Sequence, residues 1–264
     1  MHELLTGKVL LVSGATQGIG AAVARAAARE GATVMISGRN AERGGQLAEE
    51  LRGGGADAEF VRADISDVVQ AQGSVTATIE RFGRIDSLVN AAGLTDRCTL
   101  LDTDPDLFDR HIAVNLRAPF FLMQAAIADM RRRAAPGTIV NIISIDSHGG
   151  QGFLAPYVAA KAGLAGLTRN VAHAHRFDRI RVNGLNMGWS ATDGEDVIQR
   201  RGLDRRTEGA TEDWQAAAAA CLPMGKLGQP DEIADFVVFL LSDRSGVVTG
   251  SVIDWDQTVI GGLG

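Results

Sequence analysis

Short, mostly apolar segments alternate with helical segments along the whole chain, and this alternation restricts the possible folds more than any other feature. Apolar runs of strand length are typical of strands that are buried on both faces of a sheet. We expect strands at residues 8–13, 33–37, 59–63, 85–90, 138–143, 180–185 and 251–254. We expect helices at residues 20–30, 41–51, 68–82, 108–130 (bent at Pro119), 156–176 and 231–241.

This order of elements predicts an α/β fold of the doubly wound Rossmann type, a seven-stranded, mostly parallel sheet with helices on both faces. Right-handed crossovers bring the carboxyl ends of such strands to one edge, where ligands bind. No linker or compositional break divides the chain, so we expect a single domain over residues 1–264. The charged segment 190–221 has weak periodicity and is interpreted as a substrate lid or, alternatively, as a surface loop.

Charge and composition exclude several classes of partner. The chain has 26 basic and 32 acidic residues, a net charge of −6, which argues against nucleic acid or an anionic membrane. Two cysteines imply no disulfide framework. The sequence shows no secretion signal and no apolar run near the roughly 20 residues that span a bilayer, so we expect a cytoplasmic protein. No metal-ligand spacing is present, and we expect no catalytic metal.

A glycine-rich turn follows the first expected strand and opens the first expected helix. Glycine lets the backbone turn tightly and approach a ligand, and the helix amino terminus offers N–H groups to a pyrophosphate. The alternative interpretation is a plain strand–helix turn. The residues expected to bind a dinucleotide here are Gly14, Thr16, Gln17, Gly18, Ile19 and Gly20.

The choice between NAD(H) and NADP(H) depends on the residue after the second expected strand. An acidic residue at this place binds the ribose 2′-hydroxyl of NAD, but here Arg39 follows the strand and the next acid is Glu42. Arg39 is suited to a 2′-phosphate, so we expect a preference for NADP(H), with NAD(H) possible and a solvated Arg39 as the alternative. Asp64, followed by Ile65, is expected at the adenine or as a helix cap.

Tyr157 and Lys161 are four residues apart in an expected helix and so lie on one face of it. Ser144 follows the fifth expected strand at the ligand edge. Oxidation of an alcohol needs a base for the hydroxyl proton, and lowering the pKa of a phenol from 10 to about 7 requires about 4 kcal/mol. A nearby ammonium and the positive charge of an oxidised nicotinamide supply such stabilisation. The pattern predicts Tyr157 as acid or base and Ser144 as a donor to the substrate oxygen.

These motifs, in this order, resemble those of the short-chain dehydrogenase/reductase family over nearly the whole chain. The glycine turn resembles the T-G-x-x-x-G-x-G of the family, with Ser13 in place of threonine. The resemblance implies that Asn90, Ala91 and Gly93 support the sheet and border the cofactor. It also implies that the main chain of Asn115 holds a water that relays protons from Lys161, which contacts the nicotinamide ribose.

The segment after the sixth expected strand departs from the family pattern. Met187 precedes Gly188 where the family usually has proline, although Thr192 stands where the family contacts the nicotinamide amide. Gln17 occupies a position that is often basic in NADP-preferring members, which weakens the argument from Arg39.

Polar residues follow the fourth, fifth and sixth expected strands and predict a polar substrate pocket. Such a wall favours a polyol, a sugar or a hydroxy acid, because unpaired buried polar groups are costly. The alternative is that these residues are loop surface or helix caps. The candidates for substrate contact are Asp96, Arg97, Asp146, His148, Gln151, Trp189 and Glu195.

The expected function is therefore that of an NAD(P)-dependent oxidoreductase acting on an alcohol or carbonyl substrate. One alternative is a 3-oxoacyl-thioester reductase that docks a carrier protein through Arg131–Arg133; another is a non-catalytic nucleotide-binding regulatory protein. The family resemblance, with the apolar helix 231–241 and the last strand, leads us to expect a homotetramer, unless these elements pack within the chain.

Overall fold

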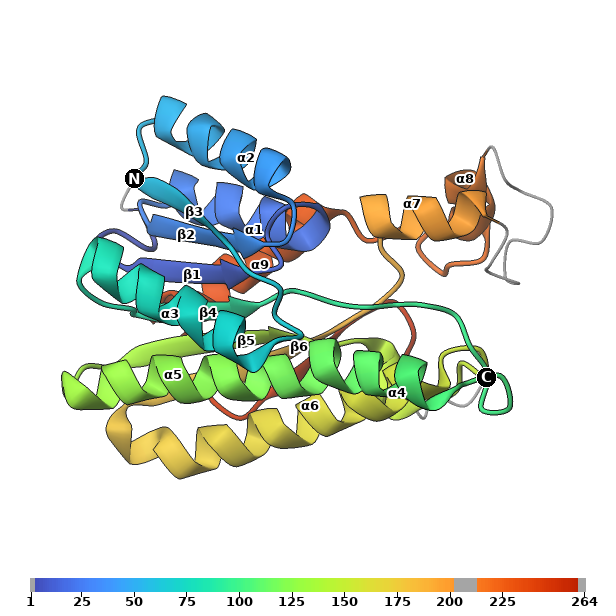
Figure 1. The fold of residues 1–264 in the computed structure, drawn as a ribbon. Coiled ribbons are helices and arrows are strands. Elements are labelled where there is room, and N and C mark those ends of the chain that lie inside the picture. Colours follow the sequence, from blue (N-terminus) through green and yellow to red (C-terminus); the bar gives the residue numbers. More distant parts are fainter. Residues whose placement is uncertain (1–2, 202–212, 261–264) are drawn as a thin grey trace.

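Seven parallel strands form the sheet in the computed structural model, which describes residues 3–201 and 213–260 (Figure 1). Their order across the sheet is β3-β2-β1-β4-β5-β6-β7, and each pair of neighbours is parallel. The order reverses between β1 and β4, which creates the crevice where such sheets bind ligands. The strands are β1 (Val9–Ser13), β2 (Thr33–Gly38), β3 (Ala58–Arg62), β4 (Ser87–Asn90), β5 (Gly137–Ile142), β6 (Ile180–Met187) and β7 (Val252–Trp255).

The helices cover both faces of the sheet (Figure 1). On one face, α1, α2 and α9 pack on strand residues such as Leu10 and Val34; on the other, α3 and α5 pack on residues such as Leu11 and Met35. Alternate residues of β1 thus enter opposite cores, as the period of a strand requires. The helices are α1 (Gly18–Arg29), α2 (Ala41–Gly53), α3 (Val68–Phe82), α4 (Pro105–Ile112), α5 (Ala118–Arg132), α6 (Ala155–His175), α7 (Asp193–Arg200), α8 (Trp214–Ala220) and α9 (Pro230–Leu241).

Helical structure covers the expected range of residues 108–130 and extends slightly beyond it at both ends, but its irregular turn precedes Pro119 instead of lying at it. The chain forms α4, then one π-helical turn, η1 (Ala113–Arg117), and then α5. Pro119 lacks an N–H group and its ring crowds the carbonyl of Asn115, four residues earlier. The wider turn before the proline accommodates both constraints, so the interruption precedes Pro119 and places Asn115 within the π turn.

The segment expected as a lid, residues 190–221, contains α7 and α8, while residues 202–212 lie outside the described part of the chain. Trp214 is 1% exposed and packs with Ala218 and Leu227 in a small apolar cluster. Its indole nitrogen donates to Asp196 Oδ1 at 2.9 Å, which connects α8 to α7. The described part of this segment therefore has its own packing.

The terminal elements differ in their exposure. The apolar side chains of α9, including Ile233, Val237 and Leu241, are buried against the chain's own core. By contrast, β7 is an edge strand whose residues are partly exposed, and Val247 before it is 94% exposed. Among the described residues, no helix combines the length and apolar character needed to cross a membrane.

Candidate active site

A cavity of about 550 Å³ lies at the carboxyl ends of β1, β4, β5 and β6. Its lining joins the glycine turn to the segments that follow β4, β5 and β6, as the topology predicts for this edge. The structure brings most of the residues singled out in the sequence to this one cavity. They are Gly14, Thr16, Gln17, Gly18, Ile19, Gly20, Arg39, Asp64, Ile65, Ala91, Gly93, Arg97, Ser144, Asp146, Gln151, Tyr157, Lys161, Gly188, Trp189, Thr192 and Glu195.

The glycine turn forms one end of the cavity, here called the cofactor end together with Arg39 and Asp64. Gly14 has φ +78°, and a Cβ on it would lie 2.5 Å from the Cα of Ala92. Gly18 has φ +55° and is the first residue of α1. Gln17, which precedes α1, makes no side-chain cap. The helix therefore presents uncapped N–H groups to the cavity, which fits a pyrophosphate.

Two arginines lie at or beside the cofactor end, and the sequence pointed to only one of them, Arg39. Arg39 lines the cavity, whereas Arg43, from the first turn of α2, donates from Nη1 to Gln17 Oε1 at 2.7 Å. Gln17 thus holds a guanidinium beside the glycine turn instead of supplying a positive charge itself. This contact could not be predicted from the sequence, because Gln17 and Arg43 are 26 residues apart and lie on different elements.

Asp64 lines the cavity, and its role as a helix cap is excluded. Its Oδ1 accepts hydrogen bonds from the main-chain N–H and the hydroxyl of Ser66, at 3.0 and 2.7 Å. The cap of α3 is Asp67, which accepts from Val69 N at 2.8 Å. Asp64 therefore shapes the turn after β3 at the cofactor end of the cavity.

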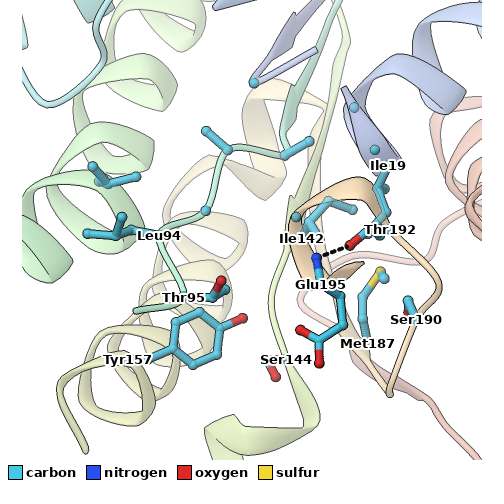
Figure 2. A pocket seen from close by; sticks show the side chains of 18 of the residues that line it. Ile19, Leu94, Thr95, Ile142, Ser144, Tyr157, Met187, Ser190, Thr192 and Glu195 are labelled. Carbon is cyan, nitrogen blue, oxygen red and sulfur yellow. Dashed lines mark hydrogen bonds between the residues drawn. The ribbon is translucent and has the colours of Figure 1, made fainter. Parts of the chain in front are cut away.

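Ser144, Tyr157 and Lys161 lie together in the middle of the cavity. Figure 2 shows the Tyr157 hydroxyl directed to the same space as Ser144 and the Glu195 carboxylate. Ser144 caps the short helix η2 (Ile145–His148), and its hydroxyl donates to Asp146 Oδ2 at 3.0 Å. Lys161, one turn after Tyr157 in α6, places its Nζ 5.6 Å from the centre of the phenol ring and donates to Ile142 O at 2.9 Å.

Burial shifts the pKa values of both Tyr157 and Lys161. It raises the pKa of Tyr157 above the ordinary value, and the negative charges of Asp146 and Glu195 raise it further, whereas the Ser144 hydroxyl and the positive charge of Arg97 lower it. Burial lowers the pKa of Lys161 to about 8. At neutral pH, Tyr157 is therefore a protonated phenol and Lys161 is mostly an ammonium, which is the proton-donating state of the pair.

Asn90 and Asn115 are buried beside the cavity and do not line it. Asn115 fastens the loop after β4, because its Oδ1 accepts from Leu94 N at 3.0 Å and its Nδ2 donates to Leu94 O at 2.9 Å. Asn90 Nδ2 donates to Asn141 Oδ1 at 2.8 Å and joins β4 to β5. Both side chains thus brace the elements that carry the cavity wall.

The other end of the cavity, here called the substrate end, is built from side chains; it comprises Arg97, Asp146, Gln151, Trp189 and Glu195. Arg97, after β4, pairs with Glu195 of α7 at 3.1 Å, and both side chains are nearly buried. Trp189 Nε1 also donates to Glu195, at 2.9 Å. This contact fixes a carboxylate and a guanidinium at the mouth of the space in front of Tyr157.

Two candidates for substrate contact lie elsewhere. Asp96 and His148 are both exposed, and neither lines the cavity. His148 Nε2 lies 3.0 Å from Asp254 Oδ1 and 3.1 Å from Asn186 Nδ2, so it connects the end of η2 to β6 and β7. Order along the chain predicts which loops reach the ligand edge but not the direction of each side chain in a loop.

The fold and this cavity define a class, the nicotinamide-dependent oxidoreductases with a Rossmann-type sheet. A family model described as "Enoyl-(Acyl carrier protein) reductase" matches residues 14–258. L-rhamnose 1-dehydrogenase (NAD(P)(+)) of Azotobacter vinelandii is 36% identical over 94% of this chain and 94% of its own. 3-oxoacyl-[acyl-carrier-protein] reductase of Thermotoga maritima is 34% identical over 97% of this chain and 99% of its own.

A solved structure of an actinorhodin polyketide ketoreductase variant with NADPH has a TM-score of 0.89 and 30% identity, covering 95% of this chain and 96% of that one. A further relative from a Cladobotryum species, named a short-chain dehydrogenase/reductase, is 37% identical over 95% of both chains. The chain belongs to the short-chain dehydrogenase/reductase family and is an NAD(P)-dependent oxidoreductase.

Proposed function

We propose that this oxidoreductase interconverts a hydroxyl and a carbonyl group on a small hydroxylated substrate, such as a polyol, a sugar or a hydroxy acid. The observation that carries the proposal is the polar wall of the substrate end, where Arg97, Glu195 and Asp146 surround the space before Tyr157. A substrate that lacks partners for these groups leaves them unpaired, which costs binding energy. The name of the rhamnose dehydrogenase supports a substrate of this kind.

The chain's own residues supply the proton transfer. When bound, the oxidised nicotinamide accepts the hydride and brings a positive charge into the cavity. Ser144 holds the substrate oxygen near the phenol of Tyr157. Tyr157 accepts the hydroxyl proton during oxidation and returns it during reduction. Lys161, held by Ile142 O, keeps an ammonium beside the phenol ring and favours its ionised form.

NADP(H) is the preferred cofactor in this proposal, and NAD(H) is used less well. The support is the pair of guanidinium groups, Arg39 in the cavity lining and Arg43 held by Gln17, with Glu42 outside the lining. Guanidinium groups bind phosphate oxygens well, whereas a carboxylate at this place would repel a 2′-phosphate. The NADPH in the related ketoreductase structure and the NAD(P)(+) in the rhamnose dehydrogenase name are consistent with this proposal.

A 3-oxoacyl-thioester reductase is the second candidate, because the matching family model and the Thermotoga relative carry such names. The basic run expected to dock a carrier protein is largely engaged within the chain. Arg132 and Arg133 both pair with the buried Asp129, and Arg131 pairs with Asp178 at 3.4 Å. These contacts weaken the carrier-docking argument and leave the hydroxylated substrate as the first candidate.

A substrate panel tests the proposal. Polyols, aldoses, hydroxy acids, long apolar ketones and a 3-oxoacyl thioester are each assayed with NADP(H) and with NAD(H), following the absorbance of the reduced nicotinamide. We expect turnover with members of the first three classes. Activity confined to the apolar ketones rejects the polar substrate end, and activity confined to the thioester supports the second candidate. Dinucleotide binding without turnover of any compound supports a non-catalytic regulatory protein.

We also propose that the protein is a cytoplasmic homotetramer. The support is the partly exposed edge strand β7, the exposed Val247 and Val248 shortly before it, and the exposed Phe239 of α9. An open strand edge and exposed apolar groups favour association. Light scattering measures the mass in solution, and a monomer as the dominant species rejects the proposal.

A further inference from the structure

His111 is a buried histidine to which the proposed reaction gives no role. Of the residues of α4, which lies entirely in the described part of the chain, His111 alone is buried, with 0% exposure. It is followed by Ile112 and then by the π turn η1. An apolar side chain at this place needs no partner, whereas a buried imidazole is costly unless its nitrogens are engaged. The presence of histidine here therefore calls for a specific function.

The amide of Asn115 determines which nitrogen of His111 carries the proton. Asn115 Oδ1 accepts from Leu94 N and Asn115 Nδ2 donates to Leu94 O, and these two bonds fix the orientation of the amide. The second hydrogen of that Nδ2 is then directed to His111 Nδ1, which lies 3.4 Å away. Nδ1 must accept, so a neutral ring carries its hydrogen on Nε2.

Burial keeps the ring neutral. It lowers the pKa of His111, which outweighs the opposing effect of the Asp96 charge, while the Arg110 charge lowers the pKa further. The Nε2–H group is buried and has no hydrogen-bond partner among the described residues. A buried donor without a protein partner is costly, so its presence needs an explanation.

The ring of His111 also contacts Tyr157. The two ring centres are 6.4 Å apart and the planes meet at 79°, an edge-to-face arrangement. One imidazole therefore contacts two residues on different elements, Tyr157 in α6 through its ring and Asn115 in η1 through Nδ1. Asn115 in turn fastens the loop that carries Arg97, so His111 lies at the junction of the phenol and the substrate end.

We propose that His111 is a positioning residue for proton transfer, which in its neutral Nε2–H form supports the Asn115 amide and sets the plane of the Tyr157 ring. The inference rests on the proposed function, because it assigns Tyr157 the proton. In this proposal, His111 positions both the phenol of Tyr157 and the loop after β4. A displaced ring or loop lowers the rate of the chemical step more than it lowers cofactor binding.

Nuclear magnetic resonance of the wild-type protein tests the tautomer without any turnover. The chain has five histidines, and with ¹⁵N-labelled histidine the two-bond ¹H–¹⁵N pattern identifies the protonation state of each ring. The set that disappears in His111→Asn belongs to His111. We expect the neutral Nε2–H pattern. A neutral Nδ1–H pattern, or a doubly protonated ring at neutral pH, overturns the proposal, and His111→Phe supplies the assignment if His111→Asn does not fold.

Two variants separate the contacts of His111. His111→Phe keeps a ring against Tyr157 but removes the acceptor for Asn115; His111→Asn keeps an acceptor near the place of Nδ1 but removes the ring. We expect kcat to fall about tenfold in each, with a KM increase only in His111→Phe, because only that variant releases the loop after β4. In His111→Phe, the rising limb of the pH profile for alcohol oxidation moves up by about half a unit, since a less polar ring now borders the phenol.

The control variant is Met130→Ala, at a buried residue of α5 that lies outside the cavity lining. It is expected to lower the melting temperature while leaving the pH profile unchanged, which separates positioning from general loss of stability.

Cofactor affinity of the free protein, measured by fluorescence titration, stays within about twofold in the His111 variants. Wild-type kcat and an unshifted pH limb in His111→Phe refute the role of His111. Absence of turnover in the wild type instead refutes the proposed function and leaves the tautomer test valid.

Discussion

The cofactor end of the cavity is shaped by the main chain, whereas the substrate end is shaped by side chains. At the cofactor end, Gly14 and Gly18 adopt left-handed backbone conformations, and the uncapped start of α1 offers its N–H groups. At the substrate end, Arg97 and Glu195 come from segments 98 residues apart and meet through their charged groups. A left-handed backbone conformation is adopted readily by few residue types, whereas a wall made of side chains can be built from many. The glycine turn of the cofactor end is thus easier to identify from sequence than the side-chain contacts of the substrate end.

The two ends meet at Tyr157, and its removal gives the largest expected effect. Tyr157→Phe removes the proton donor without altering the ring, so we expect kcat to fall by about 10³-fold or more. Cofactor affinity of the free protein stays within about twofold, because the cofactor end is untouched. Single-turnover kinetics and fluorescence titration measure the two quantities. Turnover at the wild-type rate contradicts the mechanism.

A methyl group added in the glycine turn tests the main-chain end. In Gly14→Ala, the new Cβ meets Ala92 and the backbone keeps a φ of +78°, so we expect destabilisation by about 2–4 kcal/mol and a tenfold or greater loss of cofactor affinity. The matched control is Gly45→Ala in α2, where a Cβ meets no atom within 4 Å and stability rises by up to about 1 kcal/mol. Thermal unfolding with and without cofactor measures both; equal behaviour of the two variants disproves the contrast.

Removal of one charge tests the side-chain end. Glu195→Gln keeps the shape but removes the negative charge facing Arg97, and we expect the KM of a hydroxylated substrate to rise about threefold to tenfold. Cofactor affinity is unchanged, which is the opposite of the result for the glycine turn. Asp196→Asn, a neighbouring carboxylate of α7 outside the cavity lining, is the control. A change in cofactor affinity as large as the change in KM shows that the two ends are not separable.

The smallest expected effect is a shift in pH dependence. The Asp146 charge raises the pKa of Tyr157, so Asp146→Asn lowers that pKa. Oxidation requires the ionised phenol, and its rate rises with pH through the pKa of Tyr157. The rising limb therefore moves to lower pH, by about half a unit, while the asparagine still accepts from Ser144. Initial rates across the pH range measure the shift, and a movement to higher pH contradicts the assigned sign.

The helices whose bounds could be predicted from sequence are those with a capping residue at the start and a terminating glycine at the end. Helix α3 spans Val68–Phe82 as expected, because Asp67 caps its start and Gly83, with φ 81°, ends it. The π turn at Ala113–Arg117 was missed, since a proline predicts that a helix is disturbed but not how the strain is distributed.

The same distinction holds in the site. Ser144, Tyr157 and Lys161 could be placed together because helical spacing and the strand order fix them. His111 and the Arg43–Gln17 contact could not be found, because each depends on side-chain directions between separate elements. Asp96 and Arg97 were both assigned to the pocket by their loop, and only Arg97 lines the cavity.

Tyr157 is buried in the cavity and is also the sole tyrosine of the chain, which has a practical consequence. Any tyrosinate absorbance that develops as an alkaline titration proceeds originates from this one phenol, with no background from other rings of its type. The ionisation can thus be followed optically in the unmodified protein, first alone and then with each dinucleotide added. The shift in the pKa of the Tyr157 phenol between the curves with and without a dinucleotide measures the electrostatic effect of that ligand on the phenol.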